Sequence, residues 1–234
     1  QESKRRKWRI VLMAPEIVNF SDSKVELNKL GLHKLSKDGY ASGKINLKVS
    51  EDSLMMSFKK KWRYYLRKSL STEIDIKLKK ADELDLNLLI SKYKELQKKN
   101  SFTGLNESLI VALSKYKTGD CIFSLFQAED SSSKDFLGLL VLLIHGDTAT
   151  YFIGLTNEKG RQMNTNYALL WEAILYAKKI DCCWFDIGGL DNTTPEGITH
   201  FKKGLNSNLY SLIGEWGYFQ FPFSIVKNLI IKFI

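Results

Sequence analysis

Apolar residues recur along this chain with two different periods, and the alternation between them predicts an α/β fold. Short runs that are apolar throughout or at every second position predict strands. These runs are WRIVLMAPE (8–16), KINLKV (44–49), CIFSLFQA (121–128), FLGLLVLLI (136–144), TATYFIGL (148–155), CCWFDI (182–187) and a final strand around Leu209 to Trp216.

Helical spacing of apolar residues predicts helices between these strands. Ser53 is expected to cap a helix with one apolar stripe, formed by Met55, Phe58, Trp62, Tyr65 and Leu66. Two more helices are expected over 83–99 and 106–116, and a longer one over 164–179. The longer helix turns five residues inward: Leu169, Leu170, Ala173, Ile174 and Ala177.

The connections between these elements predict the sheet topology. Short polar links join the three strands between 121 and 155, which favours antiparallel hairpins. The long helix over 164–179 separates the next two strands, which favours a parallel βαβ crossover. We therefore expect a mixed, mostly antiparallel sheet flanked by helices, with one crossover.

A change in pattern near residue 43 predicts the domain organisation. The segment from Phe20 to Gly43 is polar and weakly periodic, typical of a connector. The strand at 8–16 precedes it with only a charged tail before it. We expect 1–43 to be the end of a preceding lobe and a connector, and 44–234 to be the principal lobe.

The charge of the chain predicts a polyanionic partner. A net charge of +9 and a pI near 9.3 favour a phosphorylated precursor, RNA or the anionic inner leaflet of a membrane. No run of 18 apolar residues and no signal-peptide core is present, so a cytoplasmic location is expected. The amphipathic tail, 221–234, is expected to cover the sheet or to lie on the membrane as a peripheral contact.

Cysteine and histidine are too sparse to predict a metal or a disulfide framework. The cysteines are expected to be reduced core thiols; they are Cys121, Cys182 and Cys183. The histidines show no ligand spacing and are expected to be solvated or hydrogen-bonded; they are His33, His145 and His200.

The stretch from 184 to 204 carries the strongest candidate chemistry. Asp186 ends a buried strand, where open α/β sheets place their sites. Gly188 and Gly189 follow and permit close backbone approach. After a turn, Ile198, Phe201 and Leu205 recur at helical spacing, which leaves Lys202 and Lys203 on a short helix where a lysine is able to meet an anion.

A second candidate site lies on the basic helix near residue 63. Arg63 and Arg67 lie one turn apart, and a guanidinium fork suits phosphate. Tyr64 lies among these cations and is expected to contact the substrate; the alternative is a charged, solvated face. Asn166, near the start of the long helix, is expected to face the cleft.

An ordered series of segments resembles the FemABX family of peptidoglycan interpeptide-bridge transferases, whose lobes have the GNAT acyltransferase fold. The series covers about Lys44 to Trp216. Its members are KKKWRYYLRKS, YKELQKKNSF, FLGLLVLLIHGDTATYFIGLTNE, NTNYALLWEAILYAKK, then FDIGGLD with GITHFKKGLN, and IGEW.

The resemblance implies transfer of an aminoacyl group from aminoacyl-tRNA to an amine of a peptidoglycan or other phosphorylated cell-envelope precursor. It also implies a first lobe before the strand at 8–16. Lys202 matches the family's Phe-Lys motif, so the resemblance implies that it stabilises the oxyanion. Asp186 would help to position the amine or accept its proton; the alternative is an aspartate that caps the turn by bonding the backbone amides two residues on.

Two other functions remain open at this point. One is an acyl-CoA-dependent N-acyltransferase that acts on an amino sugar or envelope building block, and the other is a GNAT-like lobe that binds without catalysis. GNAT enzymes cradle the CoA pyrophosphate with glycine-rich amides before the crossover helix. This chain has GRQMNTN there, with one glycine, Gly160. CoA is therefore the less favoured donor, and no other cofactor is expected.

Overall fold

The computed structural model describes residues 10–35, 39–102, 104–116, 121–190 and 194–220. These residues form two compact units. Among the described residues, the larger unit is formed within 44–188 and 196–208, and the smaller unit by 10–35, 39–43, 189–190, 194–195 and 209–220. The predicted organisation, with the end of a preceding lobe and a connector in 1–43 and a principal lobe in 44–234, stays a prediction.

A seven-stranded, mostly antiparallel sheet is the framework of the site, as the sequence predicted. Its order is β4-β5-β6-β7-β8-β3-β9. The strands are β3 (Ala41–Asn46), β4 (Ile74–Lys79), β5 (Cys121–Asp130), β6 (Phe136–His145), β7 (Thr148–Thr156), β8 (Trp184–Asp186) and β9 (Asn208–Ser211).

The three expected hairpin strands and the crossover are confirmed. β5 pairs with β6 and β6 pairs with β7, both antiparallel, whereas β7 pairs parallel with β8. α8 (Thr165–Lys179) connects β7 to β8, after the short α7 (Glu158–Gln162). All five residues predicted to face inward from α8 are buried. β4 and α7 were not predicted, because β4 mixes charged with apolar residues and α7 is a single turn.

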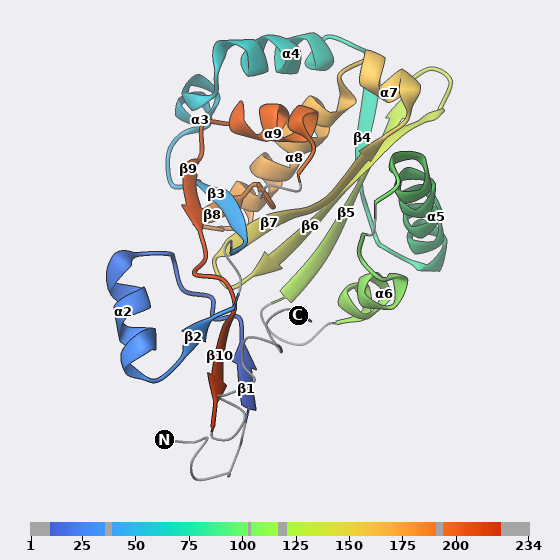
Figure 1. The fold of residues 1–234 in the computed structure, drawn as a ribbon. Coiled ribbons are helices and arrows are strands. Elements are labelled where there is room, and N and C mark those ends of the chain that lie inside the picture. The colour runs from blue at the N-terminus through green and yellow to red at the C-terminus, as the bar shows by residue number, and fades with distance from the viewer. Residues whose placement is uncertain (1–9, 36–38, 103, 117–120, 191–193, 221–234) are drawn as a thin grey trace. The chain divides into compact units, whose positions relative to one another are not determined.

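Helices cover both faces of the sheet in the larger unit (Figure 1). α5 (Glu83–Asn100) and α6 (Glu107–Lys115) pack on one face and bury a cluster that includes Leu89, Ile110 and Ile153. The other face carries α8, with α3 (Glu51–Ser57), α4 (Lys60–Leu70) and α9 (Glu196–Lys203) nearby. This helical face holds the candidate site.

The single helix expected from Ser53 onward is wrong, because the chain forms two helices there. Ser50 caps α3, with its hydroxyl accepting a hydrogen bond from the Ser53 N–H at 3.2 Å. The helix stops at Phe58, whose backbone is extended, and α4 starts at Lys60. Burial of the Phe58 ring against Trp62 and Trp171 accompanies the break. No glycine or proline marks this break in the sequence.

The smaller unit contains a three-stranded antiparallel sheet in the order β1-β10-β2. Its strands are β1 (Ile10–Met13), β2 (His33–Lys34) and β10 (Trp216–Phe219). The predicted first strand therefore pairs with the carboxyl-terminal part of the chain. The single final strand expected around 209–216 is wrong, since β9 and β10 are separate strands.

The segment expected to be a connector also holds a helix, α2 (Ser21–Lys29). The apolar pattern did not predict this helix, because Leu27 is its one buried residue and the other positions are mostly polar. Leu27 packs with Leu32, Ile213 and Trp216 in a core of the smaller unit. The predicted strand residues before 10 and the tail 221–234 lie outside the described residues.

Candidate active site

The candidate site forms where β7 and β8 stop pairing. Their parallel register ends at Thr150 and Asp186, the last residue of β8. The buried Asp186 carboxylate accepts a hydrogen bond from the Gly188 N–H at 2.8 Å. Gly188 has φ +67°, and a Cβ there would overlap the Tyr151 carbonyl oxygen. Only glycine therefore lets the chain leave β8 so close to β7.

The two neighbouring lysines of α9 lie in different environments. Lys202 is 8% exposed, and its Nζ is 5.3 Å from the centroid of the Tyr151 ring. The same Nζ would be 3.4 Å from a Cβ at Gly188. Lys203 is exposed and faces a cavity. The structure thus brings Lys202 to the strand end that carries Asp186 and Gly188.

Tyr151 is a member of this cluster that the sequence did not reveal as a site residue. It lies in β7 beside a bulge, where the register with β6 shifts between Val141 and Leu142. Burial raises the pKa of the Tyr151 phenol to about 12. The neutral ring therefore faces the Lys202 ammonium as an uncharged partner. A tyrosine in an apolar strand gave no signal for this role.

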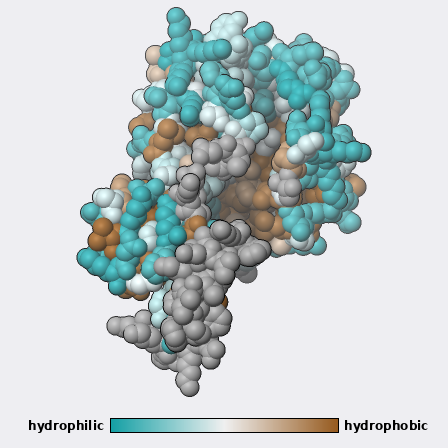
Figure 2. All heavy atoms as spheres, in the orientation of Figure 1, coloured by the Kyte–Doolittle hydropathy of each residue, from teal (hydrophilic) through white to brown (hydrophobic). Residues whose placement is uncertain are grey.

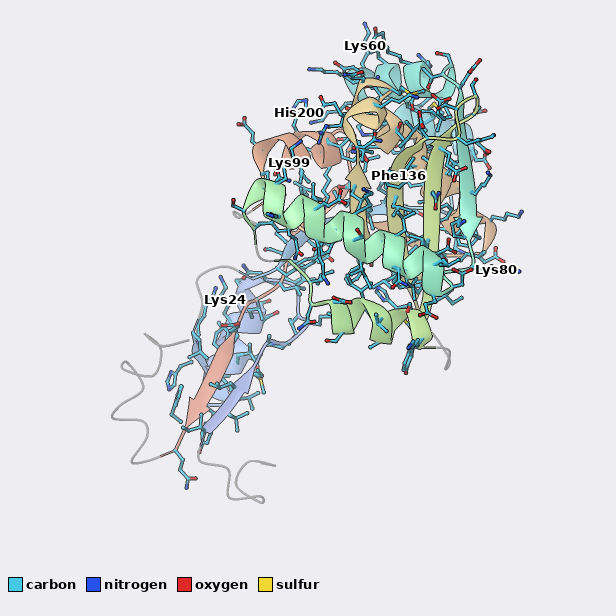
Figure 3. All side chains as sticks on the ribbon, turned by 90° about the vertical axis from the view of Figure 1, so that its right-hand side faces the viewer. Lys24, Lys60, Lys80, Lys99, Phe136 and His200 are labelled. Carbon is cyan, nitrogen blue, oxygen red and sulfur yellow. The ribbon has the colours of Figure 1, made fainter. Side chains whose placement is uncertain are left out.

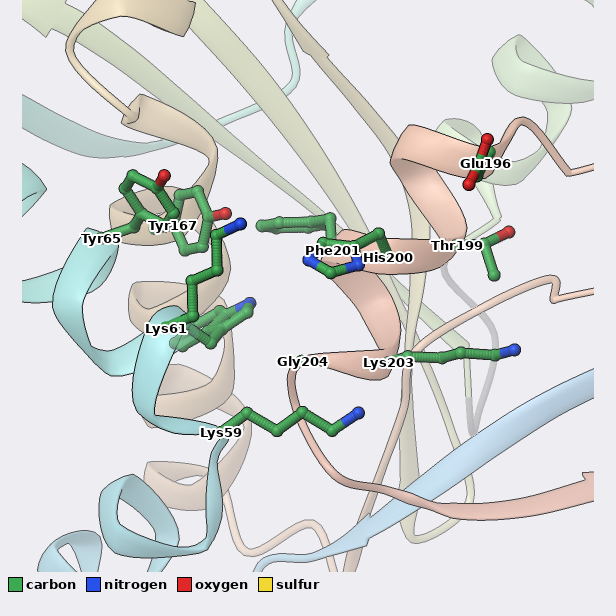
Figure 4. Close-up of a pocket in the computed structure, with 11 residues that line it drawn as sticks. Lys59, Lys61, Tyr65, Tyr167, Glu196, Thr199, His200, Phe201, Lys203 and Gly204 are labelled. Atoms are coloured by element: carbon green, nitrogen blue, oxygen red, sulfur yellow. The ribbon is translucent and has the colours of Figure 1, made fainter.

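A cavity of about 550 Å³ lies on the opposite side of α9, between α9, α4 and α8. Its lining is aromatic and basic, with Glu196 as the one acidic residue. The cations are Lys59, Lys61 and Lys203, and His200 also lines the cavity. Figure 4 shows Lys61, Tyr167 and Phe201 among the side chains that line the cavity. Such a lining suits a ligand that carries both phosphate and a planar ring.

Packed aromatic rings hold the cavity together. Tyr167 on α8 contacts Trp62, Tyr65 and Phe201, with ring centroids 4.9 to 5.3 Å apart. Trp62 is 3% exposed, yet its indole N–H has no hydrogen-bond partner among the described residues. Buried donors of this kind are usually satisfied. This N–H is fully buried, so a ligand acceptor reaches it only if the side chains around it move.

Arg63 and Arg67, the predicted phosphate clamp, have different surroundings. The Arg63 guanidinium donates to the carbonyl oxygens of Met56 at 2.7 Å and Phe58 at 3.1 Å. It thus satisfies carbonyls at the break between α3 and α4. Arg67 and Tyr64 are exposed on α4, and the Tyr64 ring contacts that of Tyr65. The phosphate role of this pair stays a prediction.

The remaining predicted residues lie outside this cluster of contacts. Asn166 is half-buried in the first turn of α8. Gly189 belongs to the smaller unit, where its carbonyl oxygen accepts a hydrogen bond from the Thr194 hydroxyl at 3.5 Å. Their substrate-binding roles stay predictions.

The position of a CoA cradle is occupied by local packing. The Gly160 N–H donates to the Asn157 side chain at 2.7 Å, and a Cβ at Gly160 would overlap the Leu137 carbonyl oxygen. Arg161 pairs with Glu158 at 3.0 Å. Gly160 is thus a packing residue of α7, and its amide already has a partner.

Sequence comparison identifies the part of the chain that builds most of this site. A model of the FemAB family matches residues 123–232. Residues 123–232 are thus similar to the FemAB family. The segment contains β6, β7, α8, β8 and α9, and hence Tyr151, Asp186, Gly188 and Lys202. The predicted resemblance is confirmed, and with it the enzyme class, an aminoacyl- or N-acyltransferase. No curated protein matches the chain.

Solved structures show the same fold. FemX matches with a TM-score of 0.78 and 17% identity, over 98% of this chain and 76% of that protein. L-PGS from Bacillus licheniformis matches with a TM-score of 0.62 and 12% identity, over 100% and 75% of the two chains. A tandem GNAT protein of the clavulanic acid biosynthesis pathway matches with a TM-score of 0.51 and 7% identity, over 93% and 66%. The GNAT-like fold of the FemAB segment is thus confirmed.

Within the described ranges, no helix has the length and apolarity that a membrane span requires. Those ranges also contain no group of three or more histidine, cysteine, aspartate or glutamate side chains arranged to hold a metal ion.

Proposed function

We propose that this protein transfers an aminoacyl group from aminoacyl-tRNA to an amine of a peptidoglycan or other phosphorylated cell-envelope precursor. One observation carries the proposal: α9 places a buried lysine directly beside residues that line a basic, aromatic cavity. Lys202 lies at the end of β8, and Phe201 and Lys203 line the cavity. A donor held in that cavity would have its ester within one turn of α9 from the ammonium.

The reaction requires a cation at the developing oxyanion. The acceptor amine attacks the ester carbonyl of the aminoacyl group, a tetrahedral intermediate forms, and the ribose hydroxyl leaves with the proton that the amine loses. Lys202 would stabilise the negative oxygen, in a buried place where one charge–charge interaction has a large effect. Asp186 would contribute by fixing the Gly188 corner beside the acceptor amine.

The cavity supports RNA as the donor. Its aromatic side chains offer stacking surfaces for a base, and its lysines offer counter-charges for phosphate. α4 continues this charge outward, because Lys60, Arg67 and Lys68 are exposed around Tyr64, which is 60% exposed. Figure 2 shows mostly hydrophilic atoms over this helix, at the top of the view. A tRNA donor also entails a cytoplasmic location.

The acceptor class is supported by the family and the charge of the chain. FemX and L-PGS share the fold, and the net charge of +9 favours a phosphorylated acceptor. Arg67 is available to bind such a phosphate. A peripheral contact with the inner membrane leaflet is part of the same proposal, since lipid-linked precursors lie there.

Transfer of label from aminoacyl-tRNA tests the proposal. Total tRNA charged with radiolabelled amino acids is incubated with the protein and a nucleotide-linked muropeptide precursor, and Lys202→Met serves as the inactive control. We expect label on the precursor only with the unaltered protein. Calorimetric titration with acetyl-CoA tests the alternative donor. Saturable acetyl-CoA binding without transfer from aminoacyl-tRNA would replace the proposal by a CoA-dependent N-acyltransferase, and RNA binding without any transfer would indicate a binding lobe.

A further inference from the structure

The bulge in β7 changes which side chains share a face of the sheet. In a regular strand, residues three apart point to opposite faces. Here Ile153 opposes Val141 and Tyr151 opposes Leu142, so Phe152 is the extra residue. Phe152 and Ile153 both pack into the core beneath α5 and α6. Tyr151 and Gly154 are thereby left on the face that carries Lys202.

Gly154 makes room for the Tyr151 side chain. A Cβ at Gly154 would overlap the Tyr151 hydroxyl oxygen and would lie 2.6 Å from Cζ. The phenol therefore lies along its own strand, over the backbone of Gly154. Any other residue at position 154 would push the ring away.

The position of the ring matters because of what lies over it. The Lys202 Nζ is 5.3 Å from the ring centroid, within the range of a cation–π interaction. Gly188 completes the arrangement, since the Tyr151 carbonyl occupies the space of its missing Cβ. Two glycines and one bulge thus hold the ring against a buried ammonium.

We propose that Tyr151 is a positioning residue for Lys202, held in place by the β7 bulge and by the missing side chain of Gly154. The aromatic face, and not the hydroxyl, supports the ammonium. The consequence for catalysis rests on the proposed function: loss of the face misplaces the cation that stabilises the oxyanion.

Lysine NMR tests the positioning without any substrate. In protein labelled with ¹³C-lysine, the Lys202 methylene signal is assigned by its loss in Lys202→Met. We expect an upfield ring-current shift that survives in Tyr151→Phe and disappears in Tyr151→Leu. An unchanged shift in Tyr151→Leu would overturn the proposal, whatever the reaction of the protein proves to be.

Transfer kinetics add a rescue experiment. Tyr151→Leu should lower kcat by about threefold to thirtyfold, with KM nearly unchanged, because that is the range of a cation–π contact. Tyr151→Phe should keep kcat. Gly154→Ala should lower kcat, because the new Cβ would overlap the hydroxyl oxygen, Cζ and Cε2 of Tyr151 and displace the ring. Gly154→Ala combined with Tyr151→Leu should be no slower than Tyr151→Leu alone, because the ring that Gly154 accommodates is already gone. If the double variant is clearly slower than Tyr151→Leu, the role of Gly154 is refuted.

Thermal melting of all four variants serves as the folding control. If Gly154→Ala fails to fold, the comparison of Tyr151→Phe with Tyr151→Leu still decides the proposal. If the unaltered protein shows no transfer while the NMR pattern is as expected, the proposed function fails and the positioning of Lys202 stands.

Discussion

Lys202 and Lys203 are adjacent in sequence, yet they differ in burial and in surroundings. Lys202 is buried at the end of β8 beside Tyr151, whereas Lys203 is exposed at the mouth of a cavity. Removing an ammonium from water costs free energy that a functional or structural partner must offset. An exposed ammonium carries no such cost. Under the proposed function, the buried lysine would act on the reacting atoms, and the exposed one would act on the charge of a bound polyanion.

The same contrast applies to the two sides of α9. The Lys202 side is built from backbone constraints, namely a bulge, a positive φ at Gly188 and a capped strand end. The cavity side is built from packed rings and exposed lysine side chains. A rigid side suits stabilisation of a transition state, and an adaptable side suits a flexible ligand.

The largest expected effect separates the two lysines. Lys202→Met should lower kcat by about 100- to 1,000-fold, the usual loss when an oxyanion partner is removed. Lys203→Met should change kcat little and raise KM for RNA. Single-turnover transfer measures both, and urea unfolding should show both proteins folded. Equal losses of kcat in the two variants would refute the assignment.

Alkaline unfolding tests the burial of Tyr151. Its pKa is raised to about 12 in the folded protein, from 10.0. The folded state therefore keeps a proton that the unfolded state loses, and stability falls as the pH rises from 10 to 12. The linked loss from Tyr151 should be about 2 kcal/mol at pH 12, and Tyr151→Phe should remove this part. Some pH dependence should remain in that variant, because burial also raises the pKa of Tyr167. Tyr64→Phe, at an exposed position, should keep the full pH dependence.

Two glycine variants test the backbone constraint at the corner that follows β8. Gly188→Ala should destabilise the protein by about 1 to 3 kcal/mol, because φ is +67° and the new Cβ overlaps a carbonyl. Gly197 lies in α9 with nothing within 4 Å of a built Cβ. Gly197→Ala should therefore be neutral or stabilising by up to about 1 kcal/mol. Urea unfolding of both variants measures the difference.

Two tryptophan variants test whether the indole N–H of Trp62 contributes to ligand binding. Trp62→Phe removes the donor in the cavity and should weaken RNA binding about fivefold to tenfold, the effect of one hydrogen bond. Trp171→Phe removes another buried indole, outside the cavity lining, and should leave RNA affinity unchanged. Both should lose some stability through the cavity created. An equal loss of affinity in both variants would mean that packing alone is responsible.

The smallest effects should come from single charges at the cavity. Lys59→Gln and Lys61→Gln should each reduce the slope of log affinity against log salt by about 1. Lys98→Gln and Lys99→Gln are matched controls, because these exposed lysines lie on α5, which covers the opposite face of the sheet. Figure 3 shows Lys60 on α4 and Lys99 on α5 on these separate elements. Fluorescence anisotropy with labelled tRNA at several salt concentrations distinguishes the two pairs.

Local pattern was sufficient for the main elements of the larger unit. Apolar runs predicted β5, β6 and β7, and helical spacing predicted α8 and its buried face, because each element buries residues at its own period. Local pattern did not predict the features that depend on tertiary packing. The break at Phe58 has no local breaker, and α2 has too few buried residues to show a period.

The chemistry divides in the same way. The strand-end aspartate, the glycine corner and the lysine pair were readable in the sequence, since burial periodicity and glycine mark them locally. Which lysine is buried was decided by how α9 packs. Tyr151 reaches Lys202 only because a bulge reverses its face, and bulges depend on strand register. The cavity joins α4, α8 and α9 from three distant segments, and such proximity exists only in the folded chain.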